Sequence, residues 1–323
     1  MNSSAPDFEQ MRTIARVLSL HFEDGLPQSQ IAAELGLSSA KVNRLIKQGR
    51  ELGMVQITIN SPFVPLFDLE NQLVRKWGLK NCVVVPAVTG SAEATLNQVG
   101  KGAAQMLLQT IRDGETIAIS GGKSISALIE NLTADRTYDV KIVPMTGGVQ
   151  GQHYTDVNHL ATSLAEKLSG RPVLIHAPLH ADSAEERDLI MSLKSVRGVM
   201  DEARQAAVAL VGIGAVMGDN STYYEARPMS QAERERLYDS GVRSEYLGHL
   251  IDHDGKQSSN DYNLRLVALL PNEVAQIPVT IAVASGAEKV EPIIAALNGG
   301  YFNSLVTDER TAEAVLEKEL SFA

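Results

Sequence analysis

The sequence contains a single cysteine, Cys82, among 323 residues, which excludes an internal disulfide framework. Cys82 lies in the apolar run CVVVP, so we interpret it as a buried strand residue and not as a nucleophile. No apolar run reaches the roughly 18 residues that a membrane-spanning helix needs. The first residues, MNSSAPDFEQMR, lack the basic-then-apolar order of a signal peptide. The sequence therefore predicts a soluble cytoplasmic protein with no membrane contact.

Metal-binding and nucleotide-binding motifs are also missing. The histidines show no HExxH spacing and a lone cysteine gives no CxxC pair, which argues against a metal site. The segment GGKS lacks the earlier glycine of a P-loop, because Ile117 stands at that position. Gly212 and Gly214 lack the third glycine of a dinucleotide fingerprint. We expect neither a metal nor a cofactor.

Charge is distributed unevenly along the chain. A formal net charge of -10 argues against non-specific coating of nucleic acid, although a local basic stripe can still bind phosphates. Residues 1–60 contain six Lys/Arg and six Asp/Glu, so the rest of the chain carries all of the net negative charge. This asymmetry indicates two segments with different functions.

The N-terminal segment has the pattern of a winged helix-turn-helix domain. Apolar spacing predicts a helix over Phe8–Phe22 and a second over Gln28–Leu35. Gly36 then supplies the left-handed residue of a tight turn. A third helix is expected from about Ser39 to Leu52, followed by an alternating strand over Met54–Ile59.

The third predicted helix carries a cation at every third position: Lys41, Arg44, Lys47 and Arg50. Such a face suits DNA, because the first turns of a recognition helix enter the major groove. We therefore assign base contacts to Ser39, Asn43 and Arg44. Lys41, Lys47 and Arg50 are assigned to phosphates. The alternative is an ordinary solvated helix face.

Beyond residue 60 the pattern changes. Residues 61–77 contain two prolines and a helical pattern from about Leu66, so we interpret them as a linker and a linking helix. Short apolar runs then alternate with helical patterns, which predicts a mostly parallel sheet covered by helices. We divide the chain into a helix-turn-helix domain (1–60), the linker and linking helix (61–77) and an α/β domain (78–323). The runs predicted as strands are Cys82–Val85, Thr116–Ile119, Val140–Val143, Pro172–Ile175, Ala206–Val211 and Val279–Ala284.

Four glycine-rich corners lie at predicted strand-to-helix junctions. In the first, Gly121 and Gly122 would let the backbone approach a ligand, while Lys123 and Ser124 add a cation and a hydroxyl. Each corner alone is better explained as a tight turn, but the four together favour a cleft for a small phosphate-bearing ligand. The corners are Ile119–Ser124, Pro144–Val149, Val211–Val216 and Ala284–Lys289.

Nearly every segment of the chain resembles the SorC/DeoR family of bacterial sugar-responsive transcriptional regulators. The resemblance rests on GLPQSQIAAELGLSSAKVNRLIKQGRELG, ISGGKS, IVPMTGGV, AVALVGIGAV and the C-terminal VASGAEKVEPIIAALNGGYFNSLVTDERTAEAVL. It implies a regulator of a carbohydrate-catabolism operon that binds double-stranded operator DNA as a homodimer or homotetramer. It also implies a phosphorylated sugar or polyol effector, bound by a domain similar to sugar-phosphate isomerases and deaminases.

The resemblance also implies which residues bind the effector. Two residue pairs in this site depart from the family pattern: Gly121-Gly122 replaces a tryptophan-glycine pair, and Ser244-Glu245 replaces a glycine-aspartate pair. The expected effector residues are Gly121, Gly122, Lys123, Ser124, Thr146, Gly147, Gly148, Glu245, Gly286 and Lys289.

The alternative function is a sugar-phosphate isomerase or deaminase with a DNA-binding head. Such an enzyme needs a carboxylate base with a raised pKa beside the substrate carbon, for which Glu245, Asp252 and Asp182 are candidates. We expect a regulator and no enzyme.

Overall fold

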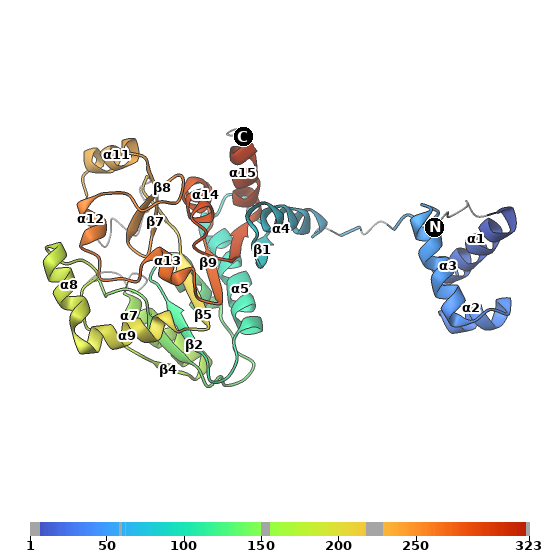
Figure 1. Ribbon diagram of the computed structural model, residues 1–323, viewed down its shortest axis with the longest axis horizontal. Coiled ribbons are helices and arrows are strands. Elements are labelled where there is room, and N and C mark those ends of the chain that lie inside the picture. The colour runs from blue at the N-terminus through green and yellow to red at the C-terminus, as the bar shows by residue number, and fades with distance from the viewer. Residues whose placement is uncertain (1–6, 58–59, 62, 150–155, 218–228, 321–323) are drawn as a thin grey trace, which may run out of the picture. The chain divides into compact units, whose positions relative to one another are not determined.

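The computed structural model describes residues 7–57, 60–61, 63–149, 156–217 and 229–320 (Figure 1). Packing divides the chain into two compact units, Met1–Val64 and Pro65–Ala323. Among the described residues, no helix is both long enough and apolar enough to cross a membrane.

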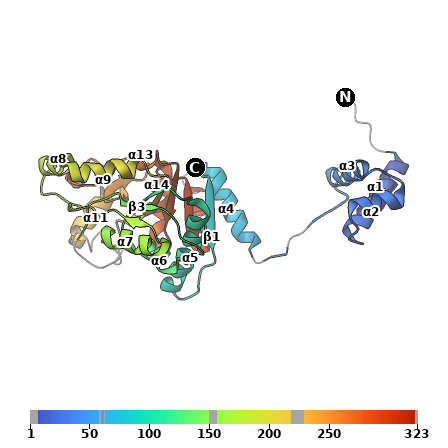
Figure 2. The same ribbon diagram turned by 90° about the horizontal axis from the view of Figure 1, so that it is seen from below.

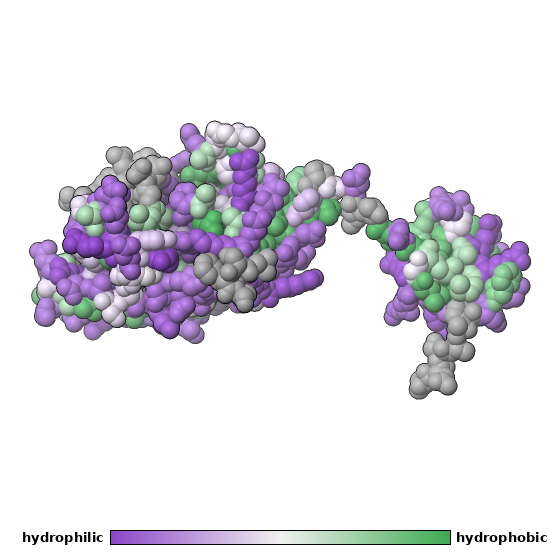
Figure 3. All heavy atoms as spheres, turned by 90° about the horizontal axis from the view of Figure 1, so that it is seen from above, coloured by the Kyte–Doolittle hydropathy of each residue, from purple (hydrophilic) through white to green (hydrophobic). Residues whose placement is uncertain are grey.

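The first unit contains three helices around a small apolar core: α1 (Phe8–Phe22), α2 (Gln28–Leu35) and α3 (Ser39–Glu51). Gly36 has φ 63°, a conformation that favours glycine, and it lets the chain turn from α2 into α3. Figure 3 shows hydrophilic side chains around an apolar area on the visible face of this unit. The buried core residues are Ile14, Val17, Leu18, Leu20, Ile31, Ala32, Val42, Leu45 and Ile46.

The predicted wing strand is not formed over Met54–Ile57, which has no regular structure, and residues 58–59 lie outside the described residues. An alternating apolar pattern becomes a strand only when a second strand accepts its backbone hydrogen bonds. The described part of the first unit contains no such partner strand.

The second unit is built on a seven-stranded sheet in which every neighbouring pair is parallel. The predicted α/β class with a mostly parallel sheet is confirmed. The strands are short apolar runs because both faces of the sheet are covered. In spatial order they are β1 (Asn81–Val85), β10 (Ser304–Asp308), β9 (Val279–Val283), β5 (Val208–Gly212), β2 (Thr116–Ile119), β3 (Lys141–Pro144) and β4 (Arg171–Pro172).

Right-handed crossovers decide which helices cover which face. The connections from β1 to β2, β2 to β3 and β3 to β4 all progress toward one edge of the sheet, so α5, α6 and α7 share a face. The connections from β4 to β5 and from β9 to β10 progress the other way, and α9 and α14 lie on the opposite face (Figure 2). The helices of this unit are α4 (Val64–Trp77), α5 (Ala92–Thr110), α6 (Lys123–Asn131), α7 (Val157–Leu168), α8 (Ala184–Ser192), α9 (Lys194–Arg204), α11 (Gln231–Asp239), α12 (Asp261–Leu264), α13 (Pro271–Val274), the 3-10 turn η1 (Ala287–Lys289), α14 (Val290–Asn298) and α15 (Glu309–Leu320).

A small antiparallel sheet lies beside the large one and was not predicted. It contains β6 (Gly214–Ala215), β7 (Val242–Tyr246) and β8 (His249–Asp252). A two-residue turn joins β7 to β8, and both of its residues, Leu247 and Gly248, have positive φ, at 56° and 84°. Leucine rarely adopts this conformation, so the surrounding packing must hold the turn in place.

Glycine permits the close approach of α5 to α6. A β-carbon on Gly100 would lie 2.4 Å from the carbonyl oxygen of Ala127, and backbone cannot move aside as a side-chain tip can. Gly198, in the middle of α9, has no atom within 4 Å of the same position.

We therefore expect Gly100→Ala and Gly198→Ala to change stability in opposite directions. Gly100→Ala should lower the free energy of unfolding by about 1–3 kcal/mol, because it forces α5 away from α6. Gly198→Ala should raise it by up to about 1 kcal/mol, because alanine is the better helix former. Urea unfolding of both variants measures the difference. Equal effects would show that the α5–α6 approach does not limit stability.

Candidate functional site

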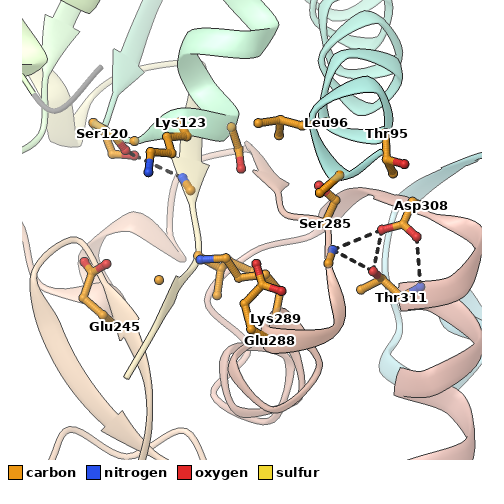
Figure 4. Close-up of a pocket in the computed structure, with 18 of the residues that line it drawn as sticks. Thr95, Leu96, Ser120, Lys123, Glu245, Ser285, Glu288, Lys289, Asp308 and Thr311 are labelled. Atoms are coloured by element: carbon orange, nitrogen blue, oxygen red, sulfur yellow. Dashed lines mark hydrogen bonds between the residues drawn. The ribbon is translucent and has the colours of Figure 1, made fainter. Parts of the chain in front are cut away.

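A cavity of about 920 Å³ opens at the carboxyl ends of the parallel strands. Its walls are the loops that follow β1, β2, β3, β5, β9 and β10, the first turns of α5, α6 and α15, and the turn between β7 and β8 (Figure 4). Strand ends and helix N-termini meet here because each parallel strand runs toward the same edge of the sheet.

The cavity lies at the point where the strand order reverses. After β2 the chain continues to β3 and β4 on one side, whereas after β5 it continues to β9 and β10 on the other. The loops after β2 and β5 therefore diverge and leave a crevice, which is where open α/β sheets bind ligands. The two loops are joined at their base, where the N–H of Gly212 donates to Ser120 Oγ at 3.1 Å.

The corner after β2 forms the start of α6. Gly122 is the N-cap residue, with φ 124°, and no side chain caps the helix. A conformation of this kind favours glycine. Gly121, Gly122, Lys123 and Ser124 all line the cavity. An uncapped helix N-terminus beside an ammonium group is an arrangement that attracts an anion.

Two partly buried charges of opposite sign lie elsewhere in the cavity wall. Burial raises the pKa of Glu245, against the hydrogen bond from the Gly248 N–H and the charge of Lys289. Burial lowers the pKa of Lys289, against the charges of Glu245 and Glu288. The described residues form no ion pair between Glu245 and Lys289, and both side chains line the cavity.

The other predicted pocket residues are placed as follows. Thr146, Gly147 and Gly286 line the cavity, whereas Gly148 does not. The N–H of Gly148 donates to the carbonyl of Ala177 at 2.9 Å. Gly148 thus helps to hold the turn together.

Asp182 and Asp252, the other two carboxylates that were candidates for a base, do not line the cavity. Asp252 instead accepts the N–H of Lys256 at 2.8 Å and closes a turn.

Sequence reasoning missed one wall of the cavity. Ser91, Thr95 and Leu96 at the start of α5 contribute to it, as does Arg310 in α15. Ser91 accepts the N–H of Ala94 at 3.1 Å as the N-cap of α5. A serine cap in the loop that follows β1 was the available signal, because it places a helix start at the same edge of the sheet.

The carboxylate of Asp308, at the end of β10, was also missed. It is 3% exposed and accepts the N–H of Gly286, at 3.2 Å, and that of Thr311, at 3.1 Å (Figure 4). The spacing Asp-x-x-Thr after an apolar run is the pattern of a helix N-cap, and it could have indicated this contact.

In the first unit, α3 exposes all six residues that were assigned to DNA: Ser39, Lys41, Asn43, Arg44, Lys47 and Arg50. The opposite face of the helix, with Val42, Leu45 and Ile46, is buried. The six side chains are therefore available to an external partner.

Two of these cations also have contacts inside the unit. The Arg50 guanidinium lies 5.4 Å from the ring centre of Phe22, and Lys47 lies 3.9 Å from the carboxylate of Glu51. Both contacts are exposed and weak, so they leave the side chains able to turn toward a partner.

Each unit matches a known family model over part of the chain. Residues 61–317 match the Sugar-bind family of sugar-binding domains. Residues 15–52 match sigma-70 region 4, over α1 to α3. Among characterised sequences, the transcriptional regulator LsrR of Escherichia coli K12 is 34% identical over 307 residues, which cover 94% of each chain. LsrR of Klebsiella pneumoniae is 33% identical over 306 residues, 94% of this chain and 92% of that one.

A solved structure resembles the whole chain. The full-length sorbitol operon regulator SorC from Klebsiella pneumoniae matches with a TM-score of 0.74 and 30% sequence identity, over 95% of this chain and 99% of that chain.

Proposed function

This chain belongs to the SorC-type family of sugar-binding transcriptional regulators, and we propose that a phosphorylated sugar or polyol controls its binding to operator DNA. The regulated genes would encode carbohydrate catabolism, and the protein would act in the cytoplasm. In this proposal α3 binds DNA and the cavity binds the effector.

The chemistry of the cavity supports a phosphorylated effector. Lys123, Lys289 and the uncapped start of α6 offer positive potential to one anionic group. Glu245 can accept hydrogen bonds from sugar hydroxyls on the same molecule. The single observation that carries the proposal is this combination of separated, partly desolvated charges of opposite sign in one cavity.

We propose binding without catalysis. The relatives in this family are transcriptional regulators. Glu245 is the one candidate base that lines the cavity, and its carboxylate already accepts the Gly248 N–H. This bond holds the carboxylate against the turn between β7 and β8, while burial, the larger effect, raises its pKa.

We expect sugar phosphates, but not the parent sugars, to stabilise the protein. The test compares glucose 6-phosphate, ribose 5-phosphate and sorbitol 6-phosphate with their unphosphorylated forms in thermal unfolding. A compound at a hundred times its Kd adds roughly 2.7 kcal/mol to the free energy of unfolding. Equal shifts from glucose and glucose 6-phosphate, and from the other two pairs, would contradict a phosphate site.

Lys289→Ala links this result to the cavity. The variant loses a charge-assisted contact worth on the order of 1.5–3 kcal/mol. Its Kd for the compound that stabilises the parent most should therefore rise roughly ten- to a hundredfold in calorimetry. Lys256→Ala is the matched control, because Lys256 is exposed and lies outside the cavity. Unchanged affinity in Lys289→Ala would remove this lysine from the site.

For DNA, we expect Arg44→Ala to reduce sequence specificity and Lys47→Ala to reduce affinity for every sequence. Arg44→Ala should cost about 1–3 kcal/mol on the operator and relax the choice of one base pair, because a bidentate base contact is lost. Lys47→Ala should weaken all DNA sequences alike and lower the salt slope by about one.

The measurement is operator binding by fluorescence anisotropy at several salt concentrations. Arg12→Ala, an exposed arginine of α1, is the matched control and should bind like the parent. If both α3 variants also bound like the parent, α3 would not be the recognition helix.

We also propose that two or more copies bind operator half-sites related by symmetry, because one recognition helix covers too few base pairs for specificity. Sedimentation of the free protein should show at least a dimer. A monomer that binds the operator tightly would contradict this. The first unit offers apolar side chains for such contacts: Phe8, Phe22, Leu52, Met54 and Ile57 are exposed.

A further inference from the structure

One carboxylate connects two walls of the cavity. Asp308 Oδ2 accepts the N–H of Gly286, in the loop before η1, at 3.2 Å. Asp308 Oδ1 accepts the N–H of Thr311, in the first turn of α15, at 3.1 Å. The Thr311 hydroxyl also donates to Asp308, and Thr311 Oγ1 accepts the Gly286 N–H at 2.9 Å. Asp308, Thr311 and Gly286 thus form a closed set of hydrogen bonds (Figure 4).

Burial makes this set of hydrogen bonds strong. Asp308 and Thr311 are 3% and 2% exposed. A buried carboxylate is costly unless its oxygens accept hydrogen bonds, and bonds to an ionised acceptor are stronger than neutral ones. Any shift of Gly286 would leave part of this carboxylate without a donor.

The loop that is held in this way carries Lys289. In the described part of the chain, the hydrogen bonds that tie Ser285–Ala287 to other elements end on Asp308 and Thr311. Gly286 has φ 109°, an unusual conformation that the surroundings must maintain. The 3-10 turn that follows starts from this glycine, because the Lys289 N–H donates to the Gly286 carbonyl at 2.9 Å.

We propose that Asp308, together with Thr311, is a positioning residue for the anion site: it fixes the loop Ser285–Lys289 and so places the Lys289 ammonium in the cavity. The same carboxylate caps α15, whose Arg310 also lines the cavity. A binding site keeps its affinity only when its supporting contacts hold the binding groups to within about 0.5 Å. The inference rests on the proposed function, because it assigns the anion to Lys289.

The test uses the full chain with three substitutions. Asp308→Asn replaces one carboxylate oxygen with an NH2 group. One of the two N–H donors, of Gly286 or of Thr311, then faces another donor and loses its acceptor. Thr311→Val keeps the shape of the side chain but removes the hydroxyl, and Thr311→Ser restores the hydroxyl. Ser183→Ala is the control, because Ser183 caps α8 outside the cavity and accepts the N–H of Glu186 at 3.1 Å.

The first measurement is hydrogen exchange of the segment 285–289 without any ligand. We expect exchange about tenfold faster or more in Asp308→Asn and Thr311→Val. Thr311→Ser should exchange like the parent. Ser183→Ala should lose stability without a change in this segment, which separates a lost helix cap from a released loop.

The second measurement is the Kd of inorganic phosphate, taken from the rise in unfolding temperature with phosphate concentration. We expect Asp308→Asn to raise this Kd by about tenfold and Thr311→Ser to leave it near that of the parent. A merely structural role would lower the unfolding temperature but leave both the Kd and the exchange of the loop unchanged, and this result would overturn the inference.

The two proposals fail in different ways. If phosphate and the sugar phosphates do not stabilise the parent, the proposed effector class is wrong, and with it the assignment of an anion to Lys289. If phosphate binds the parent and Asp308→Asn equally well, the effector class stands and the positioning role of Asp308 is wrong.

Discussion

The reversal of strand order between β2 and β5 is the constraint on which the site depends. Right-handed crossovers place helices on opposite faces on the two sides of this point, so the loops after β2 and β5 diverge. The crevice that results collects the starts of α5, α6 and α15 and the loop before α14. A chain of these strands in another order would have the same glycine corners without a common cavity.

The charges in this cavity cost free energy in the absence of a ligand. Burial opposes ionisation of both Glu245 and Lys289, and the structure describes no direct pair between them. A ligand that carries an anion at one end and hydroxyls at the other would compensate both groups at once. In the proposed function, the two separated charges would select against a simple sugar, which leaves the ammonium without an anion. They would bind a bare anion more weakly than a sugar phosphate, because it leaves the carboxylate with the Gly248 N–H alone.

The parts of the fold that could be predicted are those with a local cause. The helix Phe8–Phe22 follows from apolar spacing, and the strand Thr116–Ile119 from a short apolar run before a glycine corner. What could not be predicted depends on contacts between distant segments. Leu247 adopts a positive φ because packing holds the turn, and the dipeptide Leu247-Gly248 gives no sign of this conformation in the sequence. The prediction of a wing strand is wrong over Met54–Ile57 for a related reason, because an alternating apolar pattern does not supply a partner strand.

The same distinction explains the candidate site. Lys123 and Lys289 could be chosen from the sequence because a cation next to a glycine corner has a local rationale, whereas the wall made by Ser91 and Arg310 comes together only through the sheet order. Asp308 makes one contact of each kind. Its hydrogen bond from Thr311 at the start of α15 is local in sequence, whereas its hydrogen bond from Gly286 joins the end of β10 to the loop after β9. The sequence carries a signal only for the helix cap, which sequence reasoning missed, whereas the support of the loop that carries Lys289 is visible only in the structure. This second role of Asp308 follows from the parallel pairing of β9 with β10, which brings the ends of both strands to the same edge of the sheet.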